Sequence, residues 1–233
     1  MPSLLLKLSG PMQSWGTQSR YRRRDSGHEP SKSGVIGLIA AALGRARTEP
    51  VDDLARLTFA VRVDAPGTLL RDYQTAKDWD RPRDDVSLST RYYLSDAVFV
   101  AAVEGDQEAL KNIESALKKP VYPLYLGRRS CPAGYDLVLG IREESAEEAL
   151  RNEEWHVPEH RRAEFPDPVQ LRILRDAKPG EQGDLVQDVP VSFNQEHRQY
   201  AVRAVVSAEP KTVENPKGKR HSDVDFMRTV TEA

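Results

Sequence analysis

The sequence predicts an α+β fold, and three observations lead to this prediction. Over residues 1–142, short apolar strands alternate with two helical segments. A polar, aromatic-rich stretch at about 68–93 interrupts this alternation. Three further short strands follow a linker rich in Glu and Pro. The order β-α-β-insertion-β-α-loop-β fits a ferredoxin-like or RRM-like domain, and too few βα units are present for a doubly wound sheet. We expect this domain to be followed by a small C-terminal β subdomain.

The first four elements follow from local patterns. Ser3–Ser9 is aliphatic and stops at Gly-Pro, which indicates a buried strand. Gly10–Pro30 is a long loop, and loops of that length are usually functional or disordered. Lys32–Leu43 is apolar and rich in small residues, so we predict a helix packed closely on the sheet. Leu57–Asp64 alternates apolar and polar residues, which indicates a second strand.

The next elements surround the insertion. Thr68–Tyr93 has few aliphatic residues and many Arg, Lys and aromatic residues, so it cannot form a core and is predicted to be an extended insertion or hairpin. Ala97–Val103 is a third strand, and Asp106–Lys119 is an amphipathic helix. A basic glycine loop, Gly127–Pro132, precedes the fourth strand at Tyr135–Ile141.

The last third of the chain is predicted to be less regular. Residues 143–208 comprise a linker and the small β subdomain, with strands at Val169–Arg175, Asp188–Phe193 and Tyr200–Val206. Residues 209–233 are rich in Pro, Lys, Gly and Asn, which indicates a mobile tail with a short helix at Asp223–Val230.

The charge of the chain is balanced overall but unevenly distributed. The net charge is −2, yet Gly10–Arg47 has seven Lys or Arg and two acidic residues, whereas Gly140–Glu164 has four Arg and eight Glu. Because distribution rather than total charge decides nucleic-acid binding, the basic stretch is compatible with such a partner. The acidic stretch is more simply a solvated face.

Several classes of protein are excluded. Cys131 is the only cysteine, so there is no disulfide framework and no cysteine zinc site. The five histidines lack HExxH spacing, and Pro158 between His156 and His160 argues against a metal-binding helix face. We therefore expect no metal and no cofactor. No segment reads as a signal peptide or a membrane span, so we expect a cytoplasmic protein with no membrane partner.

A possible phosphate site surrounds the first loop. The arginine cluster Arg20–Arg24 precedes Ser31-Lys32-Ser33-Gly34, where the first helix begins. Backbone N–H groups at a helix start are free donors for an anion, and Arg pairs with phosphate through a planar fork. The alternative is an ordinary helix capped by Ser31 or Ser33. The segment is not a Walker A loop, because Ser31 stands where a glycine should precede the lysine.

The insertion and the second loop carry similar chemistry. Arginines interleave with tyrosines in the insertion, as base stacking and phosphate pairing require, although a surface hairpin held by Arg–Asp pairs explains the composition equally well. Trp15 is by base rate more often core than a stacking platform. Together these segments give the candidate RNA-binding residues: Gln13, Ser14, Trp15, Gly16, Arg20, Arg22, Lys32, Ser33, Gly34, Arg71, Tyr73, Arg91, Tyr92, Gly127, Arg128, Arg129 and Ser130.

The motifs Leu8–Gly16, Pro30–Gly44, Arg71–Ala76, Tyr125–Pro132 and Asp188–Phe193 occur in the order in which they occur in a known family. The chain resembles the CasD family of subunits of the type I-E CRISPR effector complex, Cascade. The resemblance implies a RAMP-type, RRM-like fold that holds the 5′ handle of the guide RNA. It also implies a thumb, formed by the insertion, that meets the neighbouring backbone subunit. The large subunit would lie alongside, and target DNA would be reached indirectly through the complex.

The resemblance favours a non-catalytic RNA-binding subunit. The alternative is a metal-independent endoribonuclease that processes precursor RNA, for which His28 and Tyr21 are the nearby acid–base candidates. A third possibility is an unrelated RRM-like RNA binder.

Overall fold

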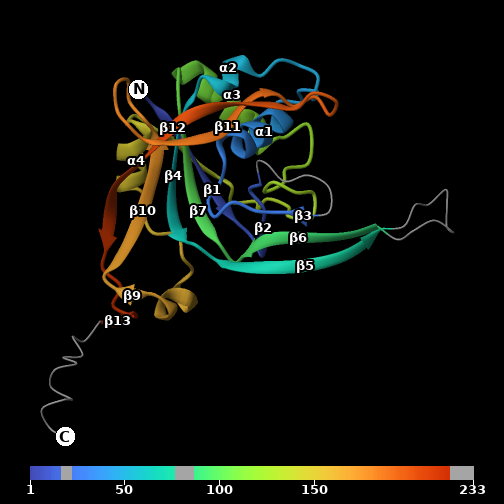
Figure 1. Ribbon diagram of the computed structural model, residues 1–233. Coiled ribbons are helices and arrows are strands. Elements are labelled where there is room, and N and C mark those ends of the chain that lie inside the picture. The colour runs from blue at the N-terminus through green and yellow to red at the C-terminus, as the bar shows by residue number, and fades with distance from the viewer. Residues whose placement is uncertain (17–22, 77–86, 221–233) are drawn as a thin grey trace, which may run out of the picture.

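The computed structural model describes residues 1–16, 23–76 and 87–220 and has a curled, seven-stranded antiparallel sheet at its centre (Figure 1). The strand order is β11-β12-β10-β4-β7-β1-β8. These strands are β1 (Ser3–Ser9), β4 (Thr58–Ala65), β7 (Val98–Glu104), β8 (Val138–Arg142), β10 (Val169–Asp176), β11 (Asp184–Ser192) and β12 (Gln199–Val213). The strands and helices predicted for residues 1–142 are all present, with their bounds shifted by up to three residues.

Helices cover both faces of the central strands. One face packs against α1 (Lys32–Ala42), α2 (Asp52–Ala55) and α3 (Gln107–Lys118), and the other against α4 (Ala146–Asn152). In β1, Leu4 and Leu6 face the α1 and α3 side, whereas Leu5 faces α4. Since both faces are buried, β1 is a continuous aliphatic run rather than an alternating one.

The C-terminal strands do not form a separate subdomain, contrary to the sequence-based prediction. β10 pairs with the free edge of β4, at Ile173↔Arg62 and Leu174↔Val61. Leu171 and Ile173 of β10 are buried in clusters shared with the main sheet. The predicted subdomain is too short to bury these residues by itself, so it extends the existing sheet and shares its core.

The predicted mobile tail is also wrong for residues 209–220. β12 continues to Val213, and β13 (Lys219–Arg220) pairs in parallel with β9 (Pro166–Asp167). The buried Asn215 fixes this segment, because its side-chain amide donates to the carbonyl oxygens of Arg162, Phe165 and Pro166. Phe165 and Pro166 directly follow η1 (Glu159–Glu164). The helix predicted at Asp223–Val230 lies outside the described residues.

The insertion is a hairpin. β5 (Thr68–Ala76) and β6 (Ser87–Ser95) pair in antiparallel fashion and extend away from the main sheet (Figure 1). The short strands β2 (Met12–Gln13) and β3 (Arg23–Arg24) add to β6 near the body. Gly67 makes the turn into the hairpin with φ +71°, and a Cβ there would lie 2.5 Å from the carbonyl oxygen of Ser95. The hairpin therefore requires glycine at this position.

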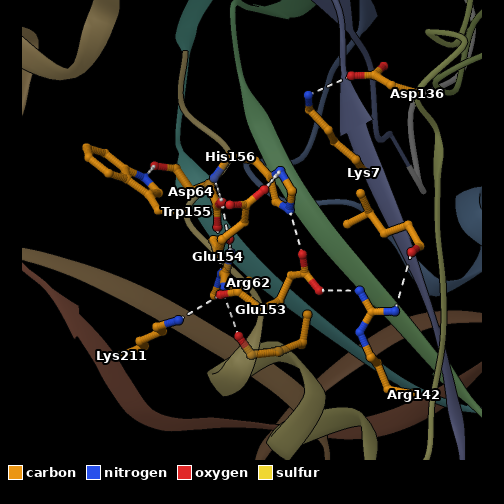
Figure 2. A network of polar contacts seen from close by, with 12 residues as sticks. Lys7, Arg62, Asp64, Asp136, Arg142, Glu153, Glu154, Trp155, His156 and Lys211 are labelled. Atoms are coloured by element: carbon orange, nitrogen blue, oxygen red, sulfur yellow. Dashed lines mark hydrogen bonds and ion pairs between the residues drawn. The ribbon is translucent and has the colours of Figure 1, made fainter. Parts of the chain in front are cut away.

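A buried arginine of the sheet holds the end of α4 (Figure 2). Arg62 of β4 is fully buried and donates to both carboxylate oxygens of Asp64. Its guanidinium also donates to the carbonyl oxygens of Leu150, Glu153 and Glu154 at the end of α4. A buried guanidinium needs such complete pairing, because an unpaired charge in the core is strongly destabilising.

Candidate nucleic-acid interface

A groove with a volume of about 1090 Å³ runs along α1. Its walls come from residues 14–16, the segments 45–47 and 122–129, and the turn between β11 and β12. Among the described residues, Asp25 is the single acidic side chain in the lining. Five arginines line the same groove: Arg45, Arg47, Arg128, Arg129 and Arg198. The groove is therefore cationic although the chain as a whole is not.

The floor of the groove is a surface of α1 that includes several small residues. Gly34, Gly37 and Ala41 of α1 all line the groove. Phe193 at the end of β11 packs against Gly37, where an added Cβ would lie 3.4 Å from its ring. Small residues let a ligand approach the helix backbone closely. Tyr122, Tyr125 and Tyr200 supply aromatic rings along the walls.

Gln13 belongs to the core rather than to a binding surface, which corrects the prediction for this residue. Trp15 is buried as well, although it is among the residues that line the groove. The Trp15 indole N–H donates to Gln13 Oε1 at 3.0 Å, and the Gln13 amide donates to the carbonyl oxygens of Leu8 and Ala97. Trp15 is 2% exposed, and its ring packs against Gly34. Because these polar atoms satisfy one another, both side chains can be buried. The neighbouring Ser14 and Gly16 line the groove.

Lys32 is also not a groove residue. Its Nζ pairs with Asp176 at 3.0 Å, and its backbone N–H donates to Asp188 at 2.7 Å. Arg203 bridges the same two carboxylates, so the four charges form a closed cluster between α1 and the C-terminal strands. Burial of Lys32 is possible because this cluster compensates its charge.

The start of α1 is an ordinary capped helix. Ser31 is the N-cap, and its Oγ accepts from the Gly34 backbone N–H at 3.2 Å. Ser33 is largely buried but lines the groove together with Gly34. The alternative interpretation of this motif, a helix capped by Ser31 or Ser33, was therefore right for Ser31.

The second basic loop contributes two arginines with different surroundings. Arg129 is exposed in the groove, and within the described part of the chain no carboxylate lies within ion-pairing distance of it. Arg128 is half-buried and donates to the carbonyl oxygens of Tyr92 and Asp25. Ser130 donates to the Tyr93 hydroxyl at 3.3 Å. Gly127, with φ +91°, lines the groove.

The remaining predicted residues lie elsewhere. Arg71 and Tyr73 are exposed on the hairpin, and Arg91 and Tyr92 are half-buried near its root; none of the four lines the groove. Arg20 and Arg22 lie outside the described residues.

Arg45 is held by a carboxylate on a neighbouring helix. It forms a two-point ion pair with Asp53 of α2. This hydrogen bond holds the pKa of the Asp53 carboxyl below its usual value and raises the pKa of Arg45. Much of the charge of Arg45 is therefore offset, and the less constrained cations are Arg47, Arg129 and Arg198.

Comparisons with known proteins identify the family of the chain. A family model described as CRISPR-associated protein (Cas_Cas5) matches residues 3–206. The chain belongs to this family. The CRISPR system Cascade subunit CasD of Escherichia coli (strain K12) is 37% identical to this Cas_Cas5 chain over 171 residues, which cover 65% of the chain and 76% of that relative.

Solved structures give the same result. A chain of a CRISPR RNA-guided surveillance complex superposes with a TM-score of 0.76 at 32% identity, covering 99% of this chain and 98% of that one. A crystal structure of a Cas protein superposes with a TM-score of 0.67 at 36% identity, covering 93% and 97%. The resemblance to CasD noted from the motifs is thereby confirmed.

Sequence reasoning missed several groove residues of the Cas_Cas5 chain. Arg45 and Arg47 fall in the basic stretch but follow the helix, where no motif singled them out. Arg198 and Tyr200 had no local signal. They reach the groove because β11 and β12 extend the main sheet beside α1, a long-range pairing that periodicity does not reveal.

One group outside the groove has metal-ligand chemistry. Ligand atoms of Glu153, Glu154 and His156 lie within 4.8 Å of one another (Figure 2). Glu153 already pairs with Arg142 at 2.8 Å and contacts His156 at 3.1 Å. These contacts are those of an ion-pair network.

Within the described residues, no helix is long and apolar enough to cross a membrane.

Proposed function

We propose that this chain is a non-catalytic, CasD-like Cascade subunit that holds the 5′ handle of the guide RNA in the groove along α1. The observation that carries the proposal is the lining of that groove, which combines five arginines with tyrosine side chains and the glycine-containing surface of α1. Single-stranded RNA is recognised by this combination of phosphate pairing and base stacking. The identity to CasD supports the assignment to Cascade.

We also propose that the core is a RAMP-type, ferredoxin-like domain. The chain order β1-α1-β4-β7-α3-β8 and the sheet order β4-β7-β1-β8 support this topology. The C-terminal strands would then be an extension that supplies one groove wall.

The hairpin fits the role of a thumb that contacts the neighbouring backbone subunit. Opposite residues of an antiparallel pair share a face, so the pairs Leu69↔Leu94, Tyr73↔Thr90 and Thr75↔Leu88 put one set of side chains on one side. Leu69, Tyr73 and Leu88 on that side are 52%, 59% and 44% exposed. Apolar side chains gathered on one face of a protruding hairpin are suited to a protein partner. The large subunit would lie beside this subunit, and target DNA would be contacted through the complex.

The groove favours binding over catalysis. His28 is exposed and is not among the lining residues, and its suggested partner Tyr21 lies outside the described residues. Purified protein incubated with repeat RNA, with and without Mg²⁺, should leave the RNA intact. Site-specific cleavage that is lost in His28→Ala would favour the endoribonuclease alternative instead.

The phosphate assignment is tested by salt dependence. Log K for a single-stranded RNA falls as log salt rises, and Arg129→Gln and Arg198→Gln should each make this slope shallower by about 0.7. The reason is that each substitution removes one phosphate contact. Arg151→Gln, on α4 and paired with Glu147, is the matched control and should leave the slope unchanged. Equal slopes in all four proteins would contradict the groove as the RNA site.

A further inference from the structure

The root of the hairpin meets the groove wall at Tyr92 and Tyr93. The carbonyl oxygen of Tyr92 accepts hydrogen bonds from Ser14 Oγ at 3.3 Å and from Arg128 Nη1 at 3.1 Å. Ser14 and Arg128 both line the groove. One carbonyl of β6 is therefore held by two separate segments of the groove wall.

The Arg128 guanidinium contacts three neighbouring residues. Beyond Tyr92, it donates through Nη2 to the Asp25 carbonyl oxygen at 3.3 Å, and it lies over the Tyr93 ring, 4.8 Å from the centroid. Gly127 sets this position: a Cβ there would lie 1.7 Å from the carbonyl oxygen of Ser14. The loop can pass this close to Ser14 only with glycine, and Arg128 is thereby directed at the hairpin root.

Tyr93 is suited to receive this contact. Its side chain is buried, and its hydroxyl accepts from Ser130 Oγ. Burial by itself would raise the pKa of the Tyr93 phenol, but hydrogen bonds from Ser130, Arg128 and Arg91 outweigh it and lower that pKa below its ordinary value. A ring in front of a guanidinium is a favourable cation–π partner.

We propose that Arg128 is a positioning residue that joins the hairpin root to the groove wall, so that hairpin and groove move as one body. A single point charge is not enough for this task, because the fork must reach two carbonyl oxygens while its face covers a ring. Arg129, next in sequence, is exposed and serves as the charge-matched comparison. The functional importance of the coupling rests on the proposed function, whereas the coupling itself is a property of the protein alone.

The test measures a distance in the isolated, RNA-free protein. Nitroxide labels are placed on Thr75→Cys at the hairpin and Lys111→Cys on α3, both exposed; Cys131 is buried, and a parent without introduced cysteines shows whether it reacts. The double electron–electron resonance distribution should be a narrow peak in the parent and in Arg129→Lys. In Arg128→Lys and Arg128→Gln the distance distribution should become broad. Only samples whose circular dichroism remains native are compared.

Two results would overturn the proposal. A distribution in both Arg128 variants as narrow as the parent's would mean that the hairpin is held without this residue. Equal broadening in Arg129→Lys would mean that any substitution in this loop loosens the hairpin, so that the Arg128 contacts have no special role in holding it. Because Arg128→Lys keeps the charge and most of the stem, it remains informative even if Arg128→Gln does not fold. Failure of RNA binding in the salt experiment would leave this distance result intact, so the two proposals fail separately.

Discussion

Gly34 shows how a single side-chain hydrogen atom shapes the edge of the groove. An added Cβ would lie 2.8 Å from the Trp15 ring and 3.0 Å from Ser31 Oγ, so the helix start and the buried indole fit only with glycine. Trp15 in turn fixes Gln13, and Gln13 holds β1 and the start of β7 through Leu8 and Ala97. The packing of these residues sets where Ser14 and Gly16 face the groove.

A pair of alanine substitutions in α1 tests this packing. Gly34→Ala should destabilise the protein by about 1–2 kcal/mol, because overpacking outweighs the gain in helix propensity. Gly37→Ala is the matched control: its Cβ would have ordinary contact with Phe193, so the propensity gain should leave stability unchanged or raise it by up to about 1 kcal/mol. Urea unfolding of both variants measures the difference. Equal effects would contradict the account of Trp15 as the constraint.

The pKa of Glu181 reports how strongly this carboxyl interacts with Arg175. Hydrogen bonds from Arg175 lower the pKa of Glu181 from 4.5 to about 2. Since the folded-state pKa is depressed, this pair stabilises the protein at pH above 4.5, and the contribution is lost as pH falls toward 2. NMR titration of the Glu181 side chain should find it ionised throughout most of that window.

The control for this titration removes the partner. In Arg175→Gln the midpoint of Glu181 should return toward 4.5, whereas Arg172→Gln, which removes an arginine paired with Glu29, should leave it near 2. An unchanged midpoint in Arg175→Gln would assign the shift to another group.

Residue roles were the hardest to predict. Trp15 and Lys32 have residue types suited to RNA, yet each finds a partner that sequence separation conceals: Lys32 pairs with Asp176, and Trp15 with Gly34. Arg129 was predictable because two arginines after a glycine rarely belong to a core. Even there, the sequence could not separate exposed Arg129 from Arg128, whose partners lie on β6 and at Asp25.

At the scale of elements, α1 and the C-terminal strands are joined by charge. Asp188 of β11 accepts from the first backbone N–H of α1 and from Arg203 of β12, and it is 1% exposed. A carboxylate at a helix start is stabilised by the helix dipole and by the free donors there. This cluster positions β11 and β12 so that Phe193, Arg198 and Tyr200 can form a groove wall.

Removing a charge from this cluster should strongly destabilise the protein. Asp188→Asn should lower the free energy of unfolding by about 3 kcal/mol, because it leaves the largely buried Arg203 and Lys32 to share one carboxylate, that of Asp176. Asp53→Asn removes the exposed Arg45–Asp53 pair and should change stability by less than about 1 kcal/mol. Denaturant unfolding of both variants distinguishes the two kinds of pair. Similar losses would mean that the Asp188 cluster is not a structural joint.

The elements themselves were largely predictable. β1, α1, β4, β7, α3 and β8 follow from aliphatic runs, periodicity and Gly or Pro stops, so their bounds matched closely. The placement of β10 beside β4 could not be predicted. No local sequence feature distinguishes a strand that extends an existing sheet from a strand that forms a separate sheet.

At the scale of the whole molecule, the body and the hairpin should separate in stability. Replacing Tyr73–Thr90 with a short Gly-Ser linker keeps the root contacts of Tyr92 and Tyr93 and removes the protruding part. The melting temperature of the isolated protein should fall by less than about 2–4 °C, the shift that 1 kcal/mol produces at this size. Co-expression followed by gel filtration should show loss of assembly with the backbone subunit. A much larger drop in melting temperature, or an intact complex, would contradict the proposed role of the hairpin.

We propose that the guide RNA lies in the groove along α1. Photo-cross-linking tests it most directly: guide RNA carrying 4-thiouridine in its 5′ handle is incorporated into the reconstituted complex, irradiated, and the linked peptides of this subunit are identified by mass spectrometry. The account predicts cross-links within residues 122–129 and 193–200, which line the groove. Cross-links confined to α4 and the opposite face of the sheet would contradict it.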